Sequence, residues 1–388
     1  MLLPSRPSPL SRIAMESVEL THGKTGYRVL GSLEEAEELL LVFGGFHFPR
    51  NCDIFLEDLH RCMEEASPGT YALLSYDYYG RGESASPEAH YNAEFYVQQA
   101  EELLLRLGVL SSDELSCSDG IERSEGNEGG KGKGGDKDSE ESVREDKSEK
   151  GEGEKEECKE ESADGDEEEE ETPSKARDER ECDEKNERVL FAGKKLSVLG
   201  YSFGGATSTQ FVSRHRERVS KWVLSGAWVT WTAFPAATTV MVKTSLTAAL
   251  LYKCYWMAMH GALEKGFENA KSEENQRIIA GMKEGEKPYL DADPEALKRA
   301  LLSTFAHFRD TKRVMTALAP LVEEEQSPNV LFAWGDKDQI APYALAEQMH
   351  QLMPTASALE PIDGNHNDIW LVDERAHKFR EALLKFFL

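Results

Sequence analysis

A serine flanked by glycines directly follows a short apolar run, and this pairing constrains the fold more than any other feature of the sequence. The apolar run is Leu196-Ser197-Val198-Leu199, and Gly200-Tyr201-Ser202-Phe203-Gly204-Gly205 comes next. A short apolar run with glycine beside it is typical of a buried strand. A serine at this spacing fits a sharp turn from a strand into a helix, where the backbone is strained and the hydroxyl faces a cleft. Bulkier residues at Gly200 or Gly204 would clash in such a turn.

Two segments downstream of this serine carry side chains that would activate it. A serine hydroxyl becomes a good nucleophile only when a base takes its proton, and the base needs a third group that fixes its tautomer and stabilises its charge. Val330-Leu331-Phe332-Ala333-Trp334 is typical of a buried strand and opens into a turn with Asp336 and Asp338. Further on, a glycine-bearing loop presents His366 ahead of a helix predicted over Glu374 to Leu388.

The order serine, aspartate, histidine resembles that of the α/β-hydrolase family. The resemblance implies that Ser202 is the nucleophile, that His366 is the general base and that Asp338 orients the base. Asp336 competes with Asp338 for this role, and the family pattern Gly-x-x-Asp favours Asp338. Asp368 lies too close to His366 along the chain to be preferred. The resemblance also implies an α/β fold: a mostly parallel central sheet with helices on both faces and a helical cap.

A glycine-rich loop near the amino terminus extends the resemblance. Leu40-Leu41-Val42-Phe43 is typical of a strand and runs into Gly44-Gly45-Phe46-His47-Phe48-Pro49, which resembles the family's oxyanion loop. By that resemblance, the backbone N–H groups of Phe46 and Phe203 would hold the negative oxygen of a tetrahedral intermediate. Gly44-Gly45 stands where the family usually has a histidine-glycine pair, so the side-chain support of this loop differs from the family pattern.

A fourth match is interpreted as structural. The strand predicted at Leu73-Leu74-Ser75-Tyr76 is followed by Asp77-Tyr78-Tyr79-Gly80-Arg81-Gly82-Glu83-Ser84, which resembles the family's Asp-x-x-Gly-x-Gly-x-Ser loop. Together, the four matching segments cover most of the chain outside one acidic block.

The acidic block extends from Ser111 to Arg188 and has a different composition from the rest of the chain. It contains almost no aliphatic or aromatic residues and holds about two-thirds of the formal net charge of −27. Such a composition cannot bury enough apolar surface to offset the entropy lost on ordering. We therefore expect the block to be disordered.

The insertion point of the acidic block constrains its role. The block lies between an amphipathic helix predicted over Ala93 to Leu107 and the strand that leads to Ser202. Helix-to-strand connections lie at the edge of a parallel sheet opposite the carboxyl ends of its strands, whereas ligands bind outside those ends. We expect the block to hang from the face opposite the active site as a solvated tether. The functional alternative is a docking segment for a basic protein partner or a substrate of acid-directed kinases.

The remaining sequence is long enough for a hydrolase core and a lid in one cooperative unit. The predicted organisation is a flexible amino terminus at 1–15, the first part of the core at 16–110, the disordered insertion at 111–188, the core with the nucleophile turn at 189–232, a helical cap at 233–315 and the core with the acid and the histidine at 316–388. Met15 is an alternative first residue of the protein.

Specificity is expected to reside in the predicted cap. About a hundred residues separate the strand at Trp222-Val223-Leu224 from the strand at Val330, which is more than a simple crossover needs. The run from Val240 to Met259 is apolar and rich in methionine and aromatic residues, so it either packs on the core or roofs a pocket. Such adaptable apolar walls suit an acyl chain or an aromatic group. The candidate substrate-binding residues are Tyr201, Trp228 and Trp256.

Composition excludes several classes of partner. An acidic chain without a basic stripe suits neither nucleic acid nor anionic membranes. The 6 cysteines show no metal-ligand spacing and are typical of reduced thiols in a cytoplasmic protein. No segment reaches about 18 uninterrupted apolar residues, so no stable membrane insertion is predicted. No metal or cofactor is implied. The amino-terminal stretch is basic and rich in serine, and a short organellar presequence is the alternative to a cytoplasmic location.

These residues predict acyl transfer to water. The expected protein is a serine hydrolase that cleaves a carboxylic ester of a small acyl or aromatic molecule, or of a lipid, through an acyl-enzyme. Serine at the nucleophile position argues against the epoxide hydrolases and haloalkane dehalogenases of the family, which use aspartate. Carbon–carbon bond hydrolysis, peptidase action and a non-catalytic ligand-binding role on the same scaffold stay open, because the fold does not fix the substrate.

Overall fold

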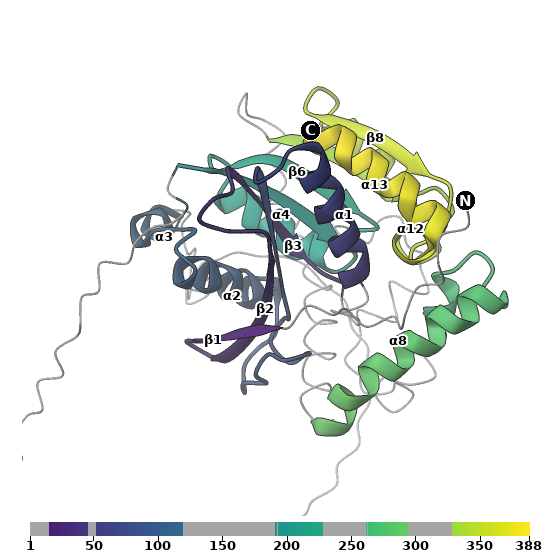
Figure 1. Ribbon diagram of the computed structural model, residues 1–388, viewed down its shortest axis with the longest axis horizontal. Coiled ribbons are helices and arrows are strands. Elements are labelled where there is room, and N and C mark those ends of the chain that lie inside the picture. The colour runs from purple at the N-terminus through teal and green to yellow at the C-terminus, as the bar shows by residue number, and fades with distance from the viewer. Residues whose placement is uncertain are drawn as a thin grey trace, which may run out of the picture. The chain divides into compact units, whose positions relative to one another are not determined.

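An 8-stranded sheet lies at the centre of the described chain (Figure 1). The structure is a computed structural model that describes residues 15–45, 52–118, 191, 193–227, 261, 263–293 and 328–388. In chain order its elements are β1 (Glu16–Leu20), β2 (Gly23–Leu30), β3 (Glu38–Phe43), α1 (Asp53–Ala66), β4 (Tyr71–Tyr76), α2 (Ala93–Arg106), α3 (Ser112–Ser118), β5 (Lys195–Tyr201), α4 (Gly204–Arg214), β6 (Val219–Ser225), α8 (Glu273–Ala292), β7 (Asn329–Gly335), α11 (Ala344–Leu352), β8 (Ser357–Ile362), α12 (Asp368–Leu371) and α13 (Asp373–Phe387).

The sheet is mostly parallel. Its strand order is β1-β2-β4-β3-β5-β6-β7-β8. β1 and β2 form an antiparallel hairpin at one edge and β2 pairs antiparallel with β4, whereas every pair from β4 to β8 is parallel. Parallel strands point in the same direction, so the loops that follow β5, β6, β7 and β8 lie together at the carboxyl ends of the strands. Proteins with α/β folds bind ligands at these ends. The predicted fold class, with a mostly parallel sheet, is confirmed.

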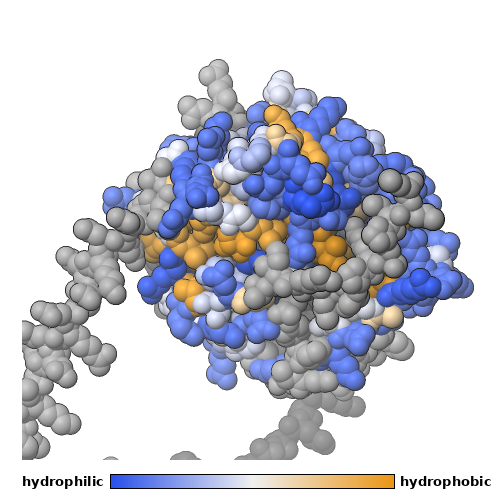
Figure 2. Space-filling model, viewed as in Figure 1, coloured by the Kyte–Doolittle hydropathy of each residue, from blue (hydrophilic) through white to orange (hydrophobic). Residues whose placement is uncertain are grey.

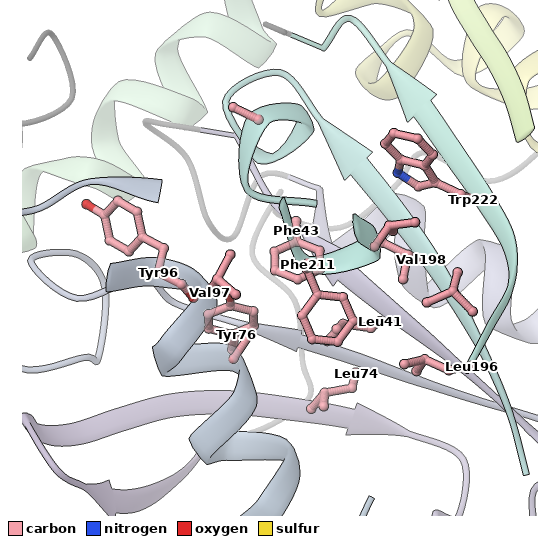
Figure 3. Packing of buried hydrophobic residues seen from close by; sticks show 14 of the residues in the cluster. Leu41, Phe43, Leu74, Tyr76, Tyr96, Val97, Leu196, Val198, Phe211 and Trp222 are labelled. Atoms are coloured by element: carbon pink, nitrogen blue, oxygen red, sulfur yellow. Dashed lines mark hydrogen bonds between the residues drawn. The ribbon is translucent and has the colours of Figure 1, made fainter. Parts of the chain in front are cut away.

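Alternating side chains give the central strands two buried faces. In β3, the odd-numbered residues from Leu39 to Phe43 pack on one face, and Leu40 and Val42 pack on the other. The first face is covered by α2, α4 and α11, and the second by α1, α12 and α13 (Figure 1). Figure 3 shows the packing on the first face, where the rings of Phe43 and Phe211 lie 5.3 Å apart. Apolar runs buried on both faces are what a parallel sheet requires.

The acidic block begins later than predicted. Residues Ser112–Ser118 form helix α3. Ser111 and Glu114 make a capping box, in which the carboxylate of Glu114 accepts the backbone N–H of Ser111 at 2.7 Å and the Ser111 hydroxyl accepts the backbone N–H of Glu114 at 3.3 Å. Glu114 also pairs with Arg218. The predicted boundary at Ser111 was wrong, because a local helix signal and an ion pair to the core outweigh acidic composition.

The two described flanks of the acidic block meet at the amino end of β5. The backbone N–H of Phe191 donates to the carbonyl of Gly108 at 2.9 Å. Ser202 follows the other end of the same strand. Residues 119–188 of the block lie outside the described residues, and their placement stays a prediction.

The surface of the described elements is mainly hydrophilic. Figure 2 shows charged and polar residues over most of the viewed face, with hydrophobic residues in a band between them. Among the described large hydrophobic side chains, those of Leu352 and Leu388 are exposed. No helix in the described ranges is both long enough and apolar enough to cross a membrane.

Candidate active site

Ser202 occupies a strained turn between β5 and α4. Its φ is 53°, a left-handed value that no other described non-glycine residue adopts. The backbone N–H of Ser202 donates to the carbonyl of Ser225, at the end of β6, at 3.0 Å, and the carbonyl of Ser202 accepts the N–H of Gly205 at 3.0 Å. Strain of this kind costs about 1–3 kcal/mol and persists only where the surroundings hold it. The strand-to-helix turn expected from the sequence is present.

Two glycines let the helix approach the sheet at this turn. A Cβ atom on Gly200 would lie 2.2 Å from the hydroxyl oxygen of Ser208, and one on Gly204 would lie 2.0 Å from the carbonyl oxygen of Phe43. A side-chain hydroxyl can rotate away, but a backbone carbonyl inside a sheet cannot. The clash expected at both glycines is therefore present, and it is more severe at Gly204.

Side chains from the loops after β5, β7 and β8 meet at the serine turn. The Nε2 atom of His366 lies 3.2 Å from Oγ of Ser202, and its Nδ1 atom lies 2.7 Å from Oδ2 of Asp338. The exposed fractions are 9% for Ser202, 5% for His366 and 6% for Asp338. An ionised carboxylate can only accept, so Nδ1 carries the proton and Nε2 is left to accept the serine proton. The three predicted residues thus lie in the predicted order Ser202, His366 and Asp338.

The two aspartates of the loop after β7 have different partners. Oδ1 of Asp338 accepts the backbone N–H groups of Ile340 at 2.8 Å and of Ala341 at 2.7 Å, which leaves Oδ2 for the imidazole. Asp336 instead accepts the backbone N–H of Gly364 at 3.1 Å. The geometry therefore favours Asp338 over Asp336 as the acid.

Tyr201, a predicted substrate-binding residue, lies against the imidazole of His366. The two ring centroids are 5.2 Å apart with an interplanar angle of 29°, and the ring of Trp370 lies 4.4 Å from that of Tyr201. The Tyr201 hydroxyl donates to Oδ1 of Asn367 at 3.1 Å. Burial is the main cause that raises the pKa of the Tyr201 phenol well above its ordinary value, so the phenol stays a neutral donor. The ring supports the histidine, and a contact with substrate stays a prediction.

A glycine without a sequence signature makes room for the histidine. Gly226 follows β6 with a φ of 54°, and a Cβ atom there would lie 2.8 Å from Cε1 and Nδ1 of His366 and 3.2 Å from Oδ2 of Asp338. A side chain at this position would strain the backbone and press on the contact between base and acid. A lone glycine after a strand is common, so only the structure reveals this role.

Phe203, the residue after the serine, immediately precedes α4. Its buried ring packs edge-on against Tyr78 and Tyr96, with centroids 5.6 and 5.5 Å away, and the guanidinium carbon of Arg81 lies 5.4 Å from the ring centroid. This packing anchors the first turn of α4, where backbone N–H groups lack partners within the helix. The use of the Phe203 N–H as an oxyanion donor stays a prediction.

Other predicted site residues lie outside the described residues. They are Phe46 of the oxyanion loop and Trp228 and Trp256 of the expected substrate wall. The apolar run from Val240 to Met259 also lies outside the described ranges. The oxyanion loop and the pocket wall therefore stay predictions.

Within the described ranges, no group of three or more His, Cys, Asp or Glu side chains is placed to hold a metal ion. Cys52 and Cys62 are free thiols. Burial raises the pKa of the Cys52 thiol, which therefore lacks the low pKa of a reactive thiolate.

The sequence matches one family model over residues 190–372, and that model is described as "alpha/beta hydrolase fold". The matched range contains Ser202, Asp338 and His366. No curated protein sequence matches the chain.

Solved structures with different activities are similar to the chain. The esterase EaEST from Exiguobacterium antarcticum is 17% identical with a TM-score of 0.56, over 95% of this chain and 98% of that one. A bromoperoxidase from Bacillus anthracis is 15% identical with a TM-score of 0.57, over 96% and 99%. A mutant of the meta-cleavage product hydrolase CumD is 13% identical with a TM-score of 0.52, over 96% and 97%. At these identities the likeness shows the fold, which by itself selects no single reaction.

Proposed function

This chain is an α/β-hydrolase-fold protein, and we propose that it is a serine hydrolase that cleaves carboxylic esters through an acyl-enzyme. The observation that carries the proposal is the chain of contacts from Oγ of Ser202 through His366 to Asp338, at 3.2 and 2.7 Å. A nucleophile, a base and an orienting acid within hydrogen-bond reach are what an activated serine needs. The esterase from Exiguobacterium antarcticum has a similar fold, so the fold is compatible with ester substrates.

In the first half-reaction, the hydroxyl oxygen of Ser202 attacks the ester carbonyl carbon while Nε2 of His366 takes the hydroxyl proton. The carbonyl oxygen becomes negatively charged in the tetrahedral intermediate. When the intermediate collapses, the bond to the leaving alcohol breaks and His366 passes its proton to the alcohol oxygen. Asp338 stabilises the transient imidazolium, because its carboxylate lies 2.7 Å from Nδ1.

In the second half-reaction, water replaces the alcohol. His366 takes a proton from water as the water oxygen attacks the acyl carbon of the acyl-enzyme. The bond to Oγ of Ser202 then breaks, and His366 returns the proton to Oγ. The carboxylic acid leaves and the free serine is restored.

The negative oxygen of both intermediates would be held by the backbone N–H groups of Phe203 and Phe46. The position of Phe203 at the start of α4 and the close packing of its ring support this role, because a fixed donor needs no reorganisation during the reaction. Loss of one such donor typically lowers kcat by about 100- to 1,000-fold.

We further infer that residues 233–315 form a cap that sets substrate choice. Helix α8 (Glu273–Ala292) lies in the stretch between β6 and β7, as a cap inserted at this point would. Trp228 and Trp256 would supply an apolar wall for an acyl chain, an aromatic group or a lipid tail.

A fluorescent fluorophosphonate tests the proposal, because it reacts covalently with activated serines. Folded wild-type protein should be labelled, and Ser202→Ala should lose the label while it keeps the wild-type circular dichroism spectrum. Hydrolysis of p-nitrophenyl esters of increasing chain length then defines the acyl preference. Labelling that persists in Ser202→Ala would assign the reactive group elsewhere, and folded wild type without label or turnover would contradict a hydrolase role.

A further inference from the structure

Asn365, immediately before His366, connects the candidate site to a segment outside the sheet. Its Oδ1 atom accepts the backbone N–H groups of His366 at 2.8 Å and of Gln339 at 2.9 Å. Its Nδ2 atom donates to the carbonyl of Lys265 at 2.7 Å. Two N–H partners on one atom and a carbonyl partner on the other leave one consistent orientation for the amide. The exposed fraction of Asn365 is 0%, so breaking these bonds would leave buried polar groups unpaired.

Asn367, immediately after the histidine, makes a second connection of the same kind. Its Nδ2 atom donates to the carbonyl of Leu263 at 3.2 Å, and its backbone N–H donates to the carbonyl of Gly266 at 2.8 Å. Its Oδ1 atom accepts the phenol of Tyr201, whose ring is stacked on the imidazole. Both neighbours of the histidine therefore bind residues 263–268, which we call the docking segment.

The docking segment has its own anchors beyond these amides. The buried carboxylate of Asp368 accepts the backbone N–H of Glu268 at 3.0 Å and pairs with Arg375 at 2.9 Å. Leu263 and Phe267 are buried in a small apolar cluster with residues of α8. The segment lies within the inferred cap, shortly before α8, and touches the histidine loop directly.

Gly266 allows the docking segment to approach Asn367. A Cβ atom on Gly266 would lie 2.1 Å from Nδ2 and 2.7 Å from Cγ of Asn367. The φ of Gly266 lies outside the left-handed region, so alanine adds this contact without backbone strain. Alanine at this position would therefore push the Asn367 amide away, although no residue of the histidine loop itself is replaced.

We propose that Asn365 and Asn367 are positioning residues that make the orientation of His366 depend on docking of residues 263–268. The inference rests on the proposed role of His366 as general base. The Oδ1 atom of Asn365 holds the backbone of His366, and that of Asn367 holds the phenol whose ring is stacked on the imidazole. Each Nδ2 atom binds the docking segment, so undocking weakens both contacts together. A misplacement of about 1 Å can cost about 100-fold in rate. Docking of the segment would therefore set the turnover rate without any contact between these asparagines and the substrate.

Three single variants of the full-length protein test the coupling: Asn365→Ala, Asn367→Ala and Gly266→Ala. With p-nitrophenyl acetate, kcat should fall by about 10- to 100-fold in each, while KM stays within about 2-fold of wild type, because only orientation of the base is lost. Nuclear magnetic resonance of ¹⁵N-labelled histidine should show a single His366 tautomer with the proton on Nδ1 in wild type and a mixture of tautomers in the variants. If the replaced residues had a purely structural role, the variants would have a lower melting temperature but an unchanged kcat and an unchanged His366 tautomer.

Asn275→Ala is the matched control. Asn275 is also buried, at 4% exposed, but its Nδ2 atom donates to the carbonyl of Asn269, within the segment that leads into α8. This variant should keep kcat within about 2-fold of wild type, because the lost hydrogen bond has no partner in the histidine loop and such separate sites act independently. A loss in Asn275→Ala as large as in Asn367→Ala would show that any weakening of the segment lowers turnover, and would overturn the specific role of the asparagines.

A double variant sharpens the test. In Gly266→Ala/Asn367→Ala the amide that would clash with the new methyl group is gone, so kcat should be no lower than in Asn367→Ala alone. Losses that multiply in the double variant would contradict the inference, as would a wild-type kcat and an unchanged tautomer in all three single variants. If wild type itself neither turns over ester nor reacts with fluorophosphonate, the proposed function fails. The histidine tautomer still decides whether the two asparagines position the imidazole.

Discussion

The serine turn and the histidine loop reach the same site, but the chain holds them by different means. Ser202 is held by backbone: a left-handed φ of 53°, an N–H bond to β6 and glycines that admit α4 against the sheet. His366 is held by side chains, namely the carboxylate of Asp338, the amide of Asn365 and the stacked ring of Tyr201, whose phenol donates to Asn367. Removal of one hydrogen bond typically costs about 0.5–1.5 kcal/mol of stability. A methyl group forced against a backbone carbonyl instead requires the backbone itself to move. Ser202 is thus fixed by the core, whereas His366 depends on side-chain contacts that single substitutions can remove.

The place of each loop in the sheet explains the difference. β5 lies in the middle of the sheet and pairs with β3 and β6, so the turn after it is surrounded by core. β8 is the last strand in the order and pairs with β7. A loop that leaves an edge strand has a neighbouring strand on one side, so its support must come from elsewhere in the chain. In this protein that support comes from residues 263–268.

The largest effect is expected from Gly204→Ala. The new Cβ atom would lie 2.0 Å from the carbonyl oxygen of Phe43, and the sheet cannot yield. We expect a loss of about 3 kcal/mol in the free energy of unfolding, measured by urea denaturation. The rate of fluorophosphonate labelling should fall by at least about 100-fold, because the Phe203 amide moves with the turn.

Gly261→Ala is the control for this variant, since no atom of the described residues lies within 4 Å of a Cβ atom at Gly261. Its unfolding free energy should change by no more than about 0.5 kcal/mol. Equal stability of the two variants would contradict the claim that close packing holds the serine turn.

Gly226→Ala should separate activity from stability. Its methyl group would press on both His366 and Asp338, and its φ of 54° is left-handed. We expect a loss of about 1–2 kcal/mol in the free energy of unfolding from the backbone. The kcat for p-nitrophenyl acetate should fall by about 100-fold, from displacement of the imidazole.

Gly69→Ala carries the same kind of strain, with a φ of 72°, and its Cβ atom would meet no atom of the described part of the chain within 4 Å. It should lose comparable stability and keep its turnover. If Gly226→Ala keeps a wild-type kcat, the close contact between Gly226 and the imidazole has no functional weight.

A smaller effect is expected from Tyr201→Phe. This change removes the hydrogen bond to Asn367 and leaves the ring stacked on the imidazole, so kcat should fall only several-fold and stability by about 1 kcal/mol. Tyr71→Phe removes a comparable buried bond, from the phenol to the carbonyl of Phe387 at 2.8 Å, away from the site. Tyr71→Phe should lower the free energy of unfolding by a similar amount and leave kcat unchanged. Equal kcat in the two variants would argue that the phenol of Tyr201 plays no part in holding the base.

A pH-dependent effect is expected in alkaline solution, where both regions lose support. Burial raises the pKa of Tyr78 and Tyr96, behind the serine turn, with Tyr96 at about 12, and raises the pKa of Tyr201, behind the histidine. The unfolded chain ionises its tyrosines near the ordinary value of 10.0, so these groups contribute their full stability below that pH. Stability should then fall as the pH rises from about 10 towards about 12.

Urea denaturation across this pH range measures the fall, and Tyr201→Phe should show a shallower one, because the unfolded state then has one fewer tyrosine to ionise. A fall of the same steepness in Tyr201→Phe would contradict the assignment of part of this loss to the histidine side of the site.

The serine turn and the histidine loop also differ in how well the sequence predicts them. The serine turn was predictable because its determinants, the apolar run and the glycines around Ser202, lie within about ten residues of one another and follow a known strand-to-helix pattern. His366 and Asp338 were predictable as residue types in order along the chain. The residues that support them were not predictable. Asn365 donates a hydrogen bond to Lys265, 100 positions away along the chain, and no local pattern marks that pair.

Helix α3 was missed for a different reason. Its Ser111–Glu114 capping box is a local signal, but the acidic composition of the surrounding block was given more weight. The mostly parallel sheet was predicted from the resemblance in motifs. The order of its strands was not predicted, since neither Gly226 nor the pairing of β8 has a signature of its own.

Mass spectrometry of the protein quenched during turnover of p-nitrophenyl acetate tests most directly whether Ser202 forms an acyl-enzyme. We expect an acetyl group on the peptide that contains Ser202, absent in Ser202→Ala and accumulating in step with the first release of p-nitrophenol. Hydrolysis by folded wild-type protein with no acyl group on Ser202, or equal hydrolysis by Ser202→Ala, would contradict this mechanism.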